Sequence, residues 1–233
     1  MNKKLISILS GLIATVLGCN AEITNYELKV NDFSELKVVD NVDVIYRCNP
    51  DSAGMAVFKA EASHASGIIF QPNGTKLQVE LAPDAPKSGL PVVTVYSTYL
   101  TKVENAGIGT VRVYDPARGP KLKVRLIGNG RLMVEGIDVH LLEGSIDTGN
   151  GTVVVKGKCD SAKLTNTGSG QIEADQLIAK QVKCSIWGTG SIGCSAEEAL
   201  SVSGAGSGQV YYLGNPSVKN RSIGVKALPL NSK

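Results

Sequence analysis

Residues 149–190 read GNGTVVVKGKCDSAKLTNTGSGQIEADQLIAKQVKCSIWGTG, and this stretch decides the fold class. It contains three Gly-X-Gly triplets about twenty residues apart, and the residues after each triplet alternate between apolar and other types. Alternation with a period of two indicates a β-strand with one buried face. Repetition of the whole unit at a nearly fixed period indicates stacked structural repeats.

The repeat extends beyond this stretch in both directions. The triplets begin at Gly107, Gly128, Gly149, Gly168, Gly188 and Gly206, which are 21, 21, 19, 20 and 18 residues apart. Four places after each first glycine stand Val111, Leu132, Val153, Ile172, Ile192 and Val210, which predict one continuous buried column. Stacking such coils pairs equivalent strands in parallel, and parallel crossovers are right-handed. The predicted fold is all-β, a right-handed parallel β-helix with coils of about 20 residues.

A second strand is expected before each triplet. Its buried column consists of Val103, Val124, Leu164, Cys184 and Val202, four places before the first glycine. Ser145 interrupts this column, and we expect Ile146 to replace it through a one-residue shift.

The first half of the chain alternates less regularly and is interrupted by prolines. It predicts further β structure, either as irregular coils or as a cap over the open end of the helix, where unpaired strands would otherwise promote aggregation. The expected organisation is an export signal at 1–21, an irregular β part at 22–100, the regular β-helix at 101–226 and a tail at 227–233.

The N-terminus resembles an export signal. Lys3 and Lys4 precede an apolar run from Leu5 to Gly18 that is short for a membrane span. Residues 16–19 resemble a bacterial lipobox, in which Cys19 is lipidated and anchors the protein, most simply as an outer-membrane lipoprotein. Cleavage before Glu22 is the alternative, and it would release a periplasmic or secreted protein.

Composition argues against a nucleic-acid partner. Of the 24 basic residues, Lys3 and Lys4 belong to the signal, which leaves 22 against 21 acidic residues, a net charge of +1. Aromatic residues make up only 5% of the chain. Nucleic-acid binding ordinarily needs a strong basic excess.

Four cysteines follow Cys19, namely Cys48, Cys159, Cys184 and Cys194. Cys184 and Cys194 fall in two different inward columns, and Cys159 falls in an expected turn. These positions are not equivalent in the repeat, so we expect free thiols that serve as small apolar side chains. A contact between cysteines of different coils remains open at this point.

No catalytic, cofactor-binding or metal-binding residue is predicted. Residues 188–193 fit the Gly-X-Gly-X-X-Gly dinucleotide pattern, but a strand is expected after them where that pattern requires a helix. The candidate acid–base residues are Asp138, His140, Glu143 and Asp147 in one turn and strand, and Glu173 with Asp175 in another. Nothing in the repeat brings two of these carboxylates together across coils, so solvated faces are expected. His64 and His140 are too far apart in the chain to form one zinc site.

Two aromatic residues are candidates for surface contact. Trp187 falls at a corner and Tyr211 at an outward position of the last full coil. Aromatic rings on one face would favour a glycan or protein partner. That interpretation requires the two side chains to be neighbours.

Several segments resemble the auto-transporter adhesin, head GIN domain family of Bacteroidetes-type bacteria. They are residues 33–38, residues 42–44, the serial Gly-Ser-Gly corners and the ending Val210-Tyr-Tyr-Leu-Gly-Asn-Pro-Ser-Val218. The resemblance covers about residues 30–225, and Ser222-Ile-Gly224 departs from it where another Gly-Ser-Gly corner is usual. It implies an exported or lipid-anchored β-helix without catalytic residues.

The predicted function is a non-enzymatic envelope or surface protein that contacts a protein or glycan partner, as an adhesin does. The alternatives are a glycan-binding or glycan-processing β-helix and a structural periplasmic protein.

Overall fold

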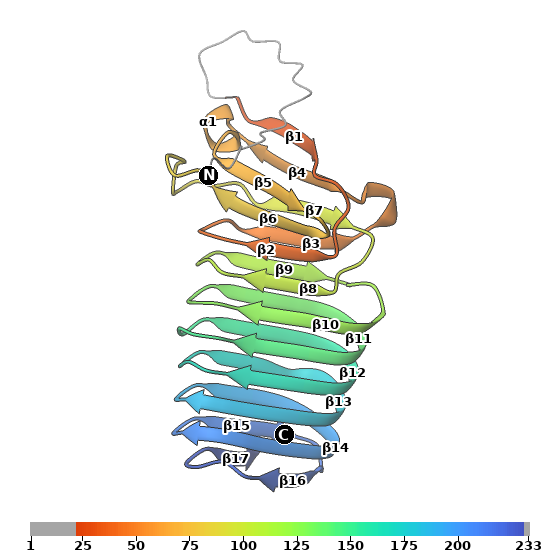
Figure 1. Cartoon of the computed structure of the whole chain (residues 1–233), viewed down its shortest axis with the longest axis vertical. Helices are drawn as coiled ribbons and strands as arrows, with labels where there is room; N and C mark the ends of the chain where they lie inside the picture. Colours follow the sequence, from red (N-terminus) through yellow and green to blue (C-terminus); the bar gives the residue numbers. More distant parts are fainter. Residues whose placement is uncertain (1–21, 231–233) are drawn as a thin grey trace.

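The computed structural model describes residues 22–230, and the predicted export signal with Cys19 lies outside this range. The fold is nearly all-β, with 64% strand and 3% helix, and it forms a β-solenoid of about six turns below a less regular N-terminal sheet (Figure 1). This confirms the predicted parallel β-helix. The helical elements are η1 (Pro50–Ser52) and α1 (Ala62–Ala65).

The regular coils are formed by ten strands that pair only in parallel with one another. They are β8 (Lys102–Asn105), β9 (Thr110–Tyr114), β10 (Gly119–Leu126), β11 (Arg131–Ile146), β12 (Thr152–Asn166), β13 (Gln171–Gly188), β14 (Ser191–Gly206), β15 (Gln209–Leu213), β16 (Ser217–Asn220) and β17 (Lys226–Pro229). Strands β11 to β14 are long because each bends halfway, with shifts of register near the bend, and so contributes to both sides of the helix.

The strands form two sheet faces, which we call the front face and the back face. Figure 1 shows the front face toward the viewer. The front face contains β2 (Glu35–Val38), β6 (Lys76–Leu81), β8, β10, the second halves of β11 to β14, and β16. The back face contains β3 (Val44–Cys48), β7 (Val93–Ser97), β9, the first halves of β11 to β14, β15 and β17.

The predicted buried column of the back face is confirmed. Its six side chains pair in register from coil to coil and are completely buried: Val111, Leu132, Val153, Ile172, Ile192 and Val210. Stacked aliphatic side chains of similar volume fill a narrow interior without gaps.

The prediction that Ile146 replaces Ser145 in the buried column of the front face is wrong. Gly144, and not Ile146, lies between Val124 and Leu164 in the ladder, while Ile146 pairs with Asn166. A leucine methyl group of Leu164 lies 3.1 Å from where a Gly144 Cβ would be, so the neighbouring coil fills the space. The extra residue of this coil lies in the corner before Gly149, where it leaves the strand register unchanged.

The corners bring backbone against backbone. A Cβ on Gly206 would lie 2.1 Å from the carbonyl oxygen of Gly188, the corner glycine of the previous coil, and Gly206 has a φ of +132°. Only glycine combines that conformation with so close an approach. The glycine repeat therefore marks the places where coils touch through their main chains.

Buried asparagines close some of these corners. The Asn166 amide donates to the carbonyls of Gly170 (2.8 Å) and Ser191 (3.3 Å), and its oxygen accepts from the Gly168 N–H (3.1 Å). Asn105 makes the equivalent three bonds in the first regular corner. These side chains satisfy backbone groups that the sharp turn leaves without ladder partners.

The last coil also closes in this way, although it lacks the Gly-X-Gly triplet. Asn220 donates to the Val225 carbonyl and accepts from the Ser222 N–H. Ile223 forms a parallel bridge with Ala205. The departure of residues 222–224 from the family pattern is therefore compatible with a complete coil.

The N-terminal part forms both irregular coils and a cap. Its strands are β1 (Thr24–Lys29), β2 (Glu35–Val38), β3 (Val44–Cys48), β4 (Met55–Ala60), β5 (Ile68–Asn73), β6 (Lys76–Leu81) and β7 (Val93–Ser97). β2 and β3 stack directly on β8 and β9, and β6 and β7 stack on their other side. Antiparallel pairing of β5 with β6, and of β4 with both β7 and β1, then ends the stack.

The cap has a different interior from the coils. Tyr46 is completely buried, its hydroxyl lies 2.9 Å from that of Ser97, and burial raises the pKa of this phenol. Tyr26, Phe58 and Phe70 stack in sequence toward the end of the sheet, with centroids 5.2 and 6.1 Å apart. Aromatic rings cover the capped end of the helix, because each ring covers a large apolar area.

The cysteines occupy partly different places from those predicted. Cys159 lies in β12 and is buried, so its assignment to a turn was wrong, and burial raises the pKa of its thiol to about 11. The sulfurs of Cys184 and Cys194 lie 4.0 Å apart across the interior, on the two strands that flank the corner at residues 188–190, so this contact is made within one coil and not between coils. All four cysteines of the described range are free thiols, as expected.

Candidate interaction surfaces

The two aromatic candidates lie on different faces. Trp187 is the residue before the last of β13, at the corner of the front face, where it is 55% exposed and pairs with Ala205. Tyr211 lies in β15 on the back face, half-buried, and its hydroxyl donates to Gln209. The structure does not bring Trp187 and Tyr211 together, so they do not form one aromatic platform.

A shallow hollow lies beside Tyr211 on the back face. Gly193 pairs with Tyr211 on one side and with Glu173 on the other, so the outward column lacks a side chain at this point. The hollow has a volume of about 250 Å³, and Asp175 also lines it. A second hollow of about 180 Å³ lies on the other side of Glu173 and Asp175. The sequence did not reveal the first hollow, because it depends on the register of Gly193 between Glu173 and Tyr211.

The candidate acid–base residues of β11, and Asp147 directly after this strand, are held in ion pairs along different parts of the surface. Asp138 contacts Arg118 (3.6 Å) and Lys158 (3.4 Å), and Asp147 contacts Arg125. The imidazole of His140 lies 2.7 Å from Asp160, a residue that the sequence interpretation did not include. These pairs leave the carboxylates as charged surface groups, each beside a cation.

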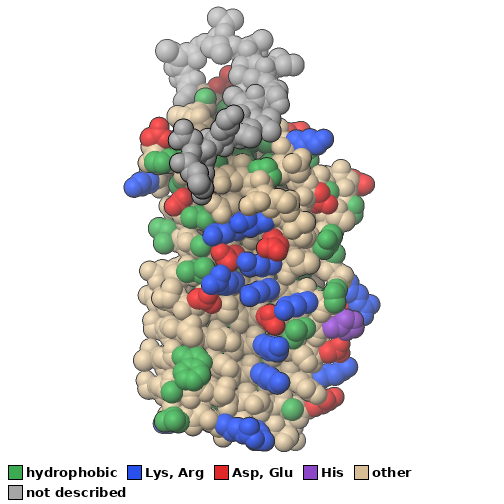
Figure 2. Space-filling model, in the orientation of Figure 1, with side chains coloured by type: hydrophobic (Ala, Val, Ile, Leu, Met, Phe, Trp, Pro, Cys, Tyr) green, Lys and Arg blue, Asp and Glu red, His purple; other side chains and the backbone are tan. Residues whose placement is uncertain are grey.

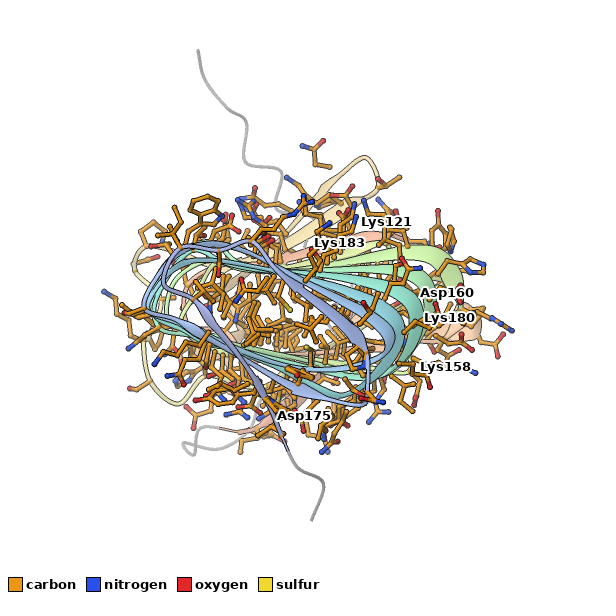
Figure 3. The ribbon with its side chains drawn as sticks, turned by 90° about the horizontal axis from the view of Figure 1, so that it is seen from below. Lys121, Lys158, Asp160, Asp175, Lys180 and Lys183 are labelled. Atoms are coloured by element: carbon orange, nitrogen blue, oxygen red, sulfur yellow. The ribbon has the colours of Figure 1, made fainter. Side chains whose placement is uncertain are left out.

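Asp160 belongs to a row of charged side chains along the side of the helix where β11 to β13 bend from the back face to the front face. Its carboxylate accepts hydrogen bonds from His140 and from Lys180 (2.9 Å), which lower the pKa of Asp160 to about 2. Figure 3 shows Lys158, Asp160 and Lys180 on this side, Lys121 and Lys183 on the front face and Asp175 on the back face. The described residues contain no group of three or more histidine, cysteine or acidic side chains that is arranged to hold a metal ion.

An outward column of the front face is rich in lysine. From the cap downward, nine positions in successive register are Lys76, Glu35, Lys102, Lys123, Glu143, Lys163, Lys183, Ser201 and Lys219. We call the six lysines of this column the lysine ladder. Figure 2 shows the resulting band of basic side chains along the front face.

Acidic side chains in and beside the column are shared between cations. Glu104, only 5% exposed, contacts Lys37 (3.4 Å), Lys102 (3.3 Å) and Arg125 (3.1 Å). Burial by itself would raise the pKa of Glu104, but Lys102, Arg125 and Lys37 outweigh it and lower the pKa. Glu143 likewise lies between Lys121 (2.7 Å) and Lys163 (3.6 Å). The front face therefore keeps an excess of positive charge after its ion pairs are formed.

The sequence contains a signal for the lysine ladder that its net charge hides. Five places before the first glycine of their triplets stand Lys102, Lys123, Lys163 and Lys183. Because side chains alternate along a strand, this position lies next to the buried column and faces solvent. A count of charges over the whole chain cannot reveal such segregation.

These features define a class of protein: a capped parallel β-helix with two broad polar faces and shallow hollows. The chain matches a family model described as "Putative auto-transporter adhesin, head GIN domain" over residues 32–216, and it belongs to that family. A search of curated proteins finds no match.

Solved structures share the fold at low sequence identity. A "putative adhesin" from Bacteroides fragilis NCTC 9343 is 20% identical with a TM-score of 0.80, and the match covers 91% of this chain and 98% of that one. A "putative adhesin" from Parabacteroides merdae ATCC 43184 is 20% identical with a TM-score of 0.70 and the same coverage. A "putative lipid binding protein" from Parabacteroides distasonis ATCC 8503 is 19% identical with a TM-score of 0.73 and again the same coverage.

Across residues 22–230, none of the helices has the length and hydrophobicity needed to cross a membrane.

Proposed function

We propose that this protein is an exported, non-enzymatic adhesin that is held at the outer membrane by a lipid on Cys19. The observation that carries the proposal is the pair of continuous sheet faces, built by coils whose strands pair in parallel register from one coil to the next. Such a surface makes many similar contacts in a row, as stacked-repeat proteins do. Membership of an adhesin-type family supports the same function.

Adhesion requires a rigid surface that does not collapse when a partner pulls on it. Each central coil pairs in parallel with the coils above and below along both of its faces, with shifts of register only near the bend. Among the described residues, every buried side-chain nitrogen and oxygen has a hydrogen-bond partner. A fully satisfied interior of this kind favours a single well-ordered shape.

The anchor is tested by intact mass and detergent partitioning of the protein from its native membrane. We expect a lipid adduct and partitioning into detergent, both lost in Cys19→Ala. Cys48→Ala is the matched control, because it removes another cysteine but should keep the lipid. A soluble mature chain that starts at Glu22 would contradict the anchor.

The adhesin function is tested by attachment of whole cells to host-cell or mucus-coated surfaces. Cells that lack the protein should attach less, and the intact protein should restore attachment. Equal attachment with and without the protein would contradict an adhesive role, whatever the outcome for the anchor.

A further inference from the structure

We propose that the lysine ladder binds a linear acidic polysaccharide that lies along the axis of the β-helix. This inference names the partner of the adhesin and rests on the function proposed above. Three observations support it. They are the alignment of lysines on the front face, the repulsion between these lysines in the folded protein, and the column of hydroxyl side chains beside them.

The column that contains the ladder follows the long axis of the molecule, and its lysines are interrupted at Glu35, Glu143 and Ser201. Its positions pair directly from one strand to the next, so neighbouring positions are separated by one strand spacing, about 4.8 Å. The spacing is similar to the length of one sugar unit in an extended polysaccharide. A chain with acidic groups at regular intervals can therefore meet several lysines without bending.

The alignment is unfavourable for the folded protein alone. Lys102 lies directly opposite Lys123, and Lys163 lies directly opposite Lys183 in the parallel ladders. Like charges in directly opposite positions destabilise a sheet. Lys123 and Lys183 are exposed and form no ion pair with any residue in the range 22–230. An anionic partner would remove the repulsion. These lysines are therefore better explained by binding to such a partner than by a contribution to folding.

The neighbouring column supplies hydrogen-bonding groups. Beside the lower ladder stand the hydroxyl side chains of Ser145, Thr165, Ser185 and Ser203 in successive register. The hydroxyls of Ser185 and Ser203 lie 2.9 Å apart. A sugar chain offers hydroxyl groups as well as acidic groups, so both columns would have complementary partners.

The same columns fit other polyanions less well. Single-stranded nucleic acid is usually bound by stacking its bases on aromatic side chains, and neither column contains one. Binding in a membrane interface needs an apolar surface beside the cations, whereas the hydroxyl column is polar. Charge and hydrogen bonding together therefore favour an acidic glycan.

The test is binding of the full chain, purified in mild detergent, to immobilised polygalacturonate, with neutral dextran as reference. The ladder variant is Lys123→Gln with Lys163→Gln and Lys183→Gln. The matched control, Lys29→Gln with Lys59→Gln and Lys226→Gln, makes the same charge change at exposed lysines outside the ladder. We expect the ladder variant to lose about tenfold or more in affinity and the control to lose less than about twofold. Added salt should weaken the binding of the unmodified chain.

Thermal melting shows whether the variants fold. The ladder variant should melt at about the same temperature as the unmodified chain, because the lost repulsion between lysines offsets the lost surface contact between Lys163 and Glu143.

Four results would overturn the proposal: no binding of the folded chain to polygalacturonate, equal binding to dextran, equal losses in both triple variants, or tighter binding to DNA or to vesicles of phosphatidylglycerol and phosphatidylcholine. Polysaccharide binding is measured on the purified chain, so it can fail while the anchor and cell attachment are confirmed, and the reverse also holds.

Discussion

The regular coils and the N-terminal cap have the same two-faced cross-section, but they reach it in different ways. In the coils, the order of strands along the chain is their order in the stack, from β11 through β14. In the cap, β2 lies between β6 and β8, so a strand from early in the sequence lies between two strands that come later. The coils repeat one set of strand pairs and corner contacts, whereas the cap adds antiparallel pairing and a cluster of aromatic side chains.

The comparison predicts that a methyl group at a coil corner has the largest effect. Gly206→Ala would place its Cβ 2.1 Å from the Gly188 carbonyl oxygen at a φ of +132°. Because neither backbone can move away, we expect a loss of more than about 3 kcal/mol in the free energy of unfolding.

The matched change in the cap is Gly74→Ala, at a φ of +60° with no atom within 4 Å of the new Cβ. It should cost about 1 kcal/mol. Urea denaturation of both variants measures the difference, and equal losses would show that the corners do not depend on close packing.

The next largest effect is expected from the asparagine of a coil corner. Asn166→Ala removes three hydrogen bonds and leaves the groups of Gly168, Gly170 and Ser191 buried without them. We expect a loss of about 2–3 kcal/mol. Asn150→Ala, at an exposed corner position, should change stability by less than about 0.5 kcal/mol. Urea denaturation compares the two variants. If Asn166→Ala and Asn150→Ala lose the same free energy of unfolding, the side-chain bonds of the corner do not stabilise the helix.

The junction between cap and coils should respond to pH. Glu104 in β8 contacts Lys37 of β2 and Arg125 of β10, so it joins the cap to the first coils. Its pKa in the folded state lies below the ordinary 4.5. The stability it contributes is therefore fully present above that value and is lost as the pH falls through the lower, folded-state pKa.

Glu104→Gln should cost about 1–2 kcal/mol at pH 7 and progressively less below pH 4.5. Urea denaturation at pH 7, 5 and 3 measures this trend. A cost that stays constant across this range would mean that the charge of Glu104 is not responsible.

The smallest of these effects is expected inside the cap. Tyr46→Phe removes the buried hydrogen bond to Ser97, whose hydroxyl still donates to the Tyr99 carbonyl (3.0 Å). We expect a loss of about 1 kcal/mol, measured by thermal denaturation. Tyr99→Phe changes an exposed ring and is the control. A loss as large as that of Asn166→Ala would mean that the cap relies on side-chain bonds as strongly as the coils do.

Reading the fold from the sequence succeeded where contacts are repetitive. The column from Val111 to Val210 follows from counting forward from each glycine, because one coil differs from the next by a nearly constant number of residues. The same counting failed at Gly144, because the extra residue lies in the corner and not in the strand. It also failed at Cys159, because β12 continues through its bend without an open turn.

The candidate surfaces were harder to predict than the fold. Trp187 and Tyr211 were identified as exposed or outward residues, but their faces follow from which half of a coil each belongs to. The lysine ladder needed the register of nine strands, two of them in the cap, before its charges formed one line. Charges that are far apart in sequence become neighbours only through the stack.

The sequence by itself determined that this chain is a parallel β-helix of glycine-cornered coils, because period-two alternation and a twenty-residue repeat are local properties of the chain. Only the tertiary structure decided the order of the cap strands, the sharing of Glu104 among three cations and the alignment of the lysines. These features depend on contacts between segments separated by tens of residues, and such contacts are set by packing and pairing in space.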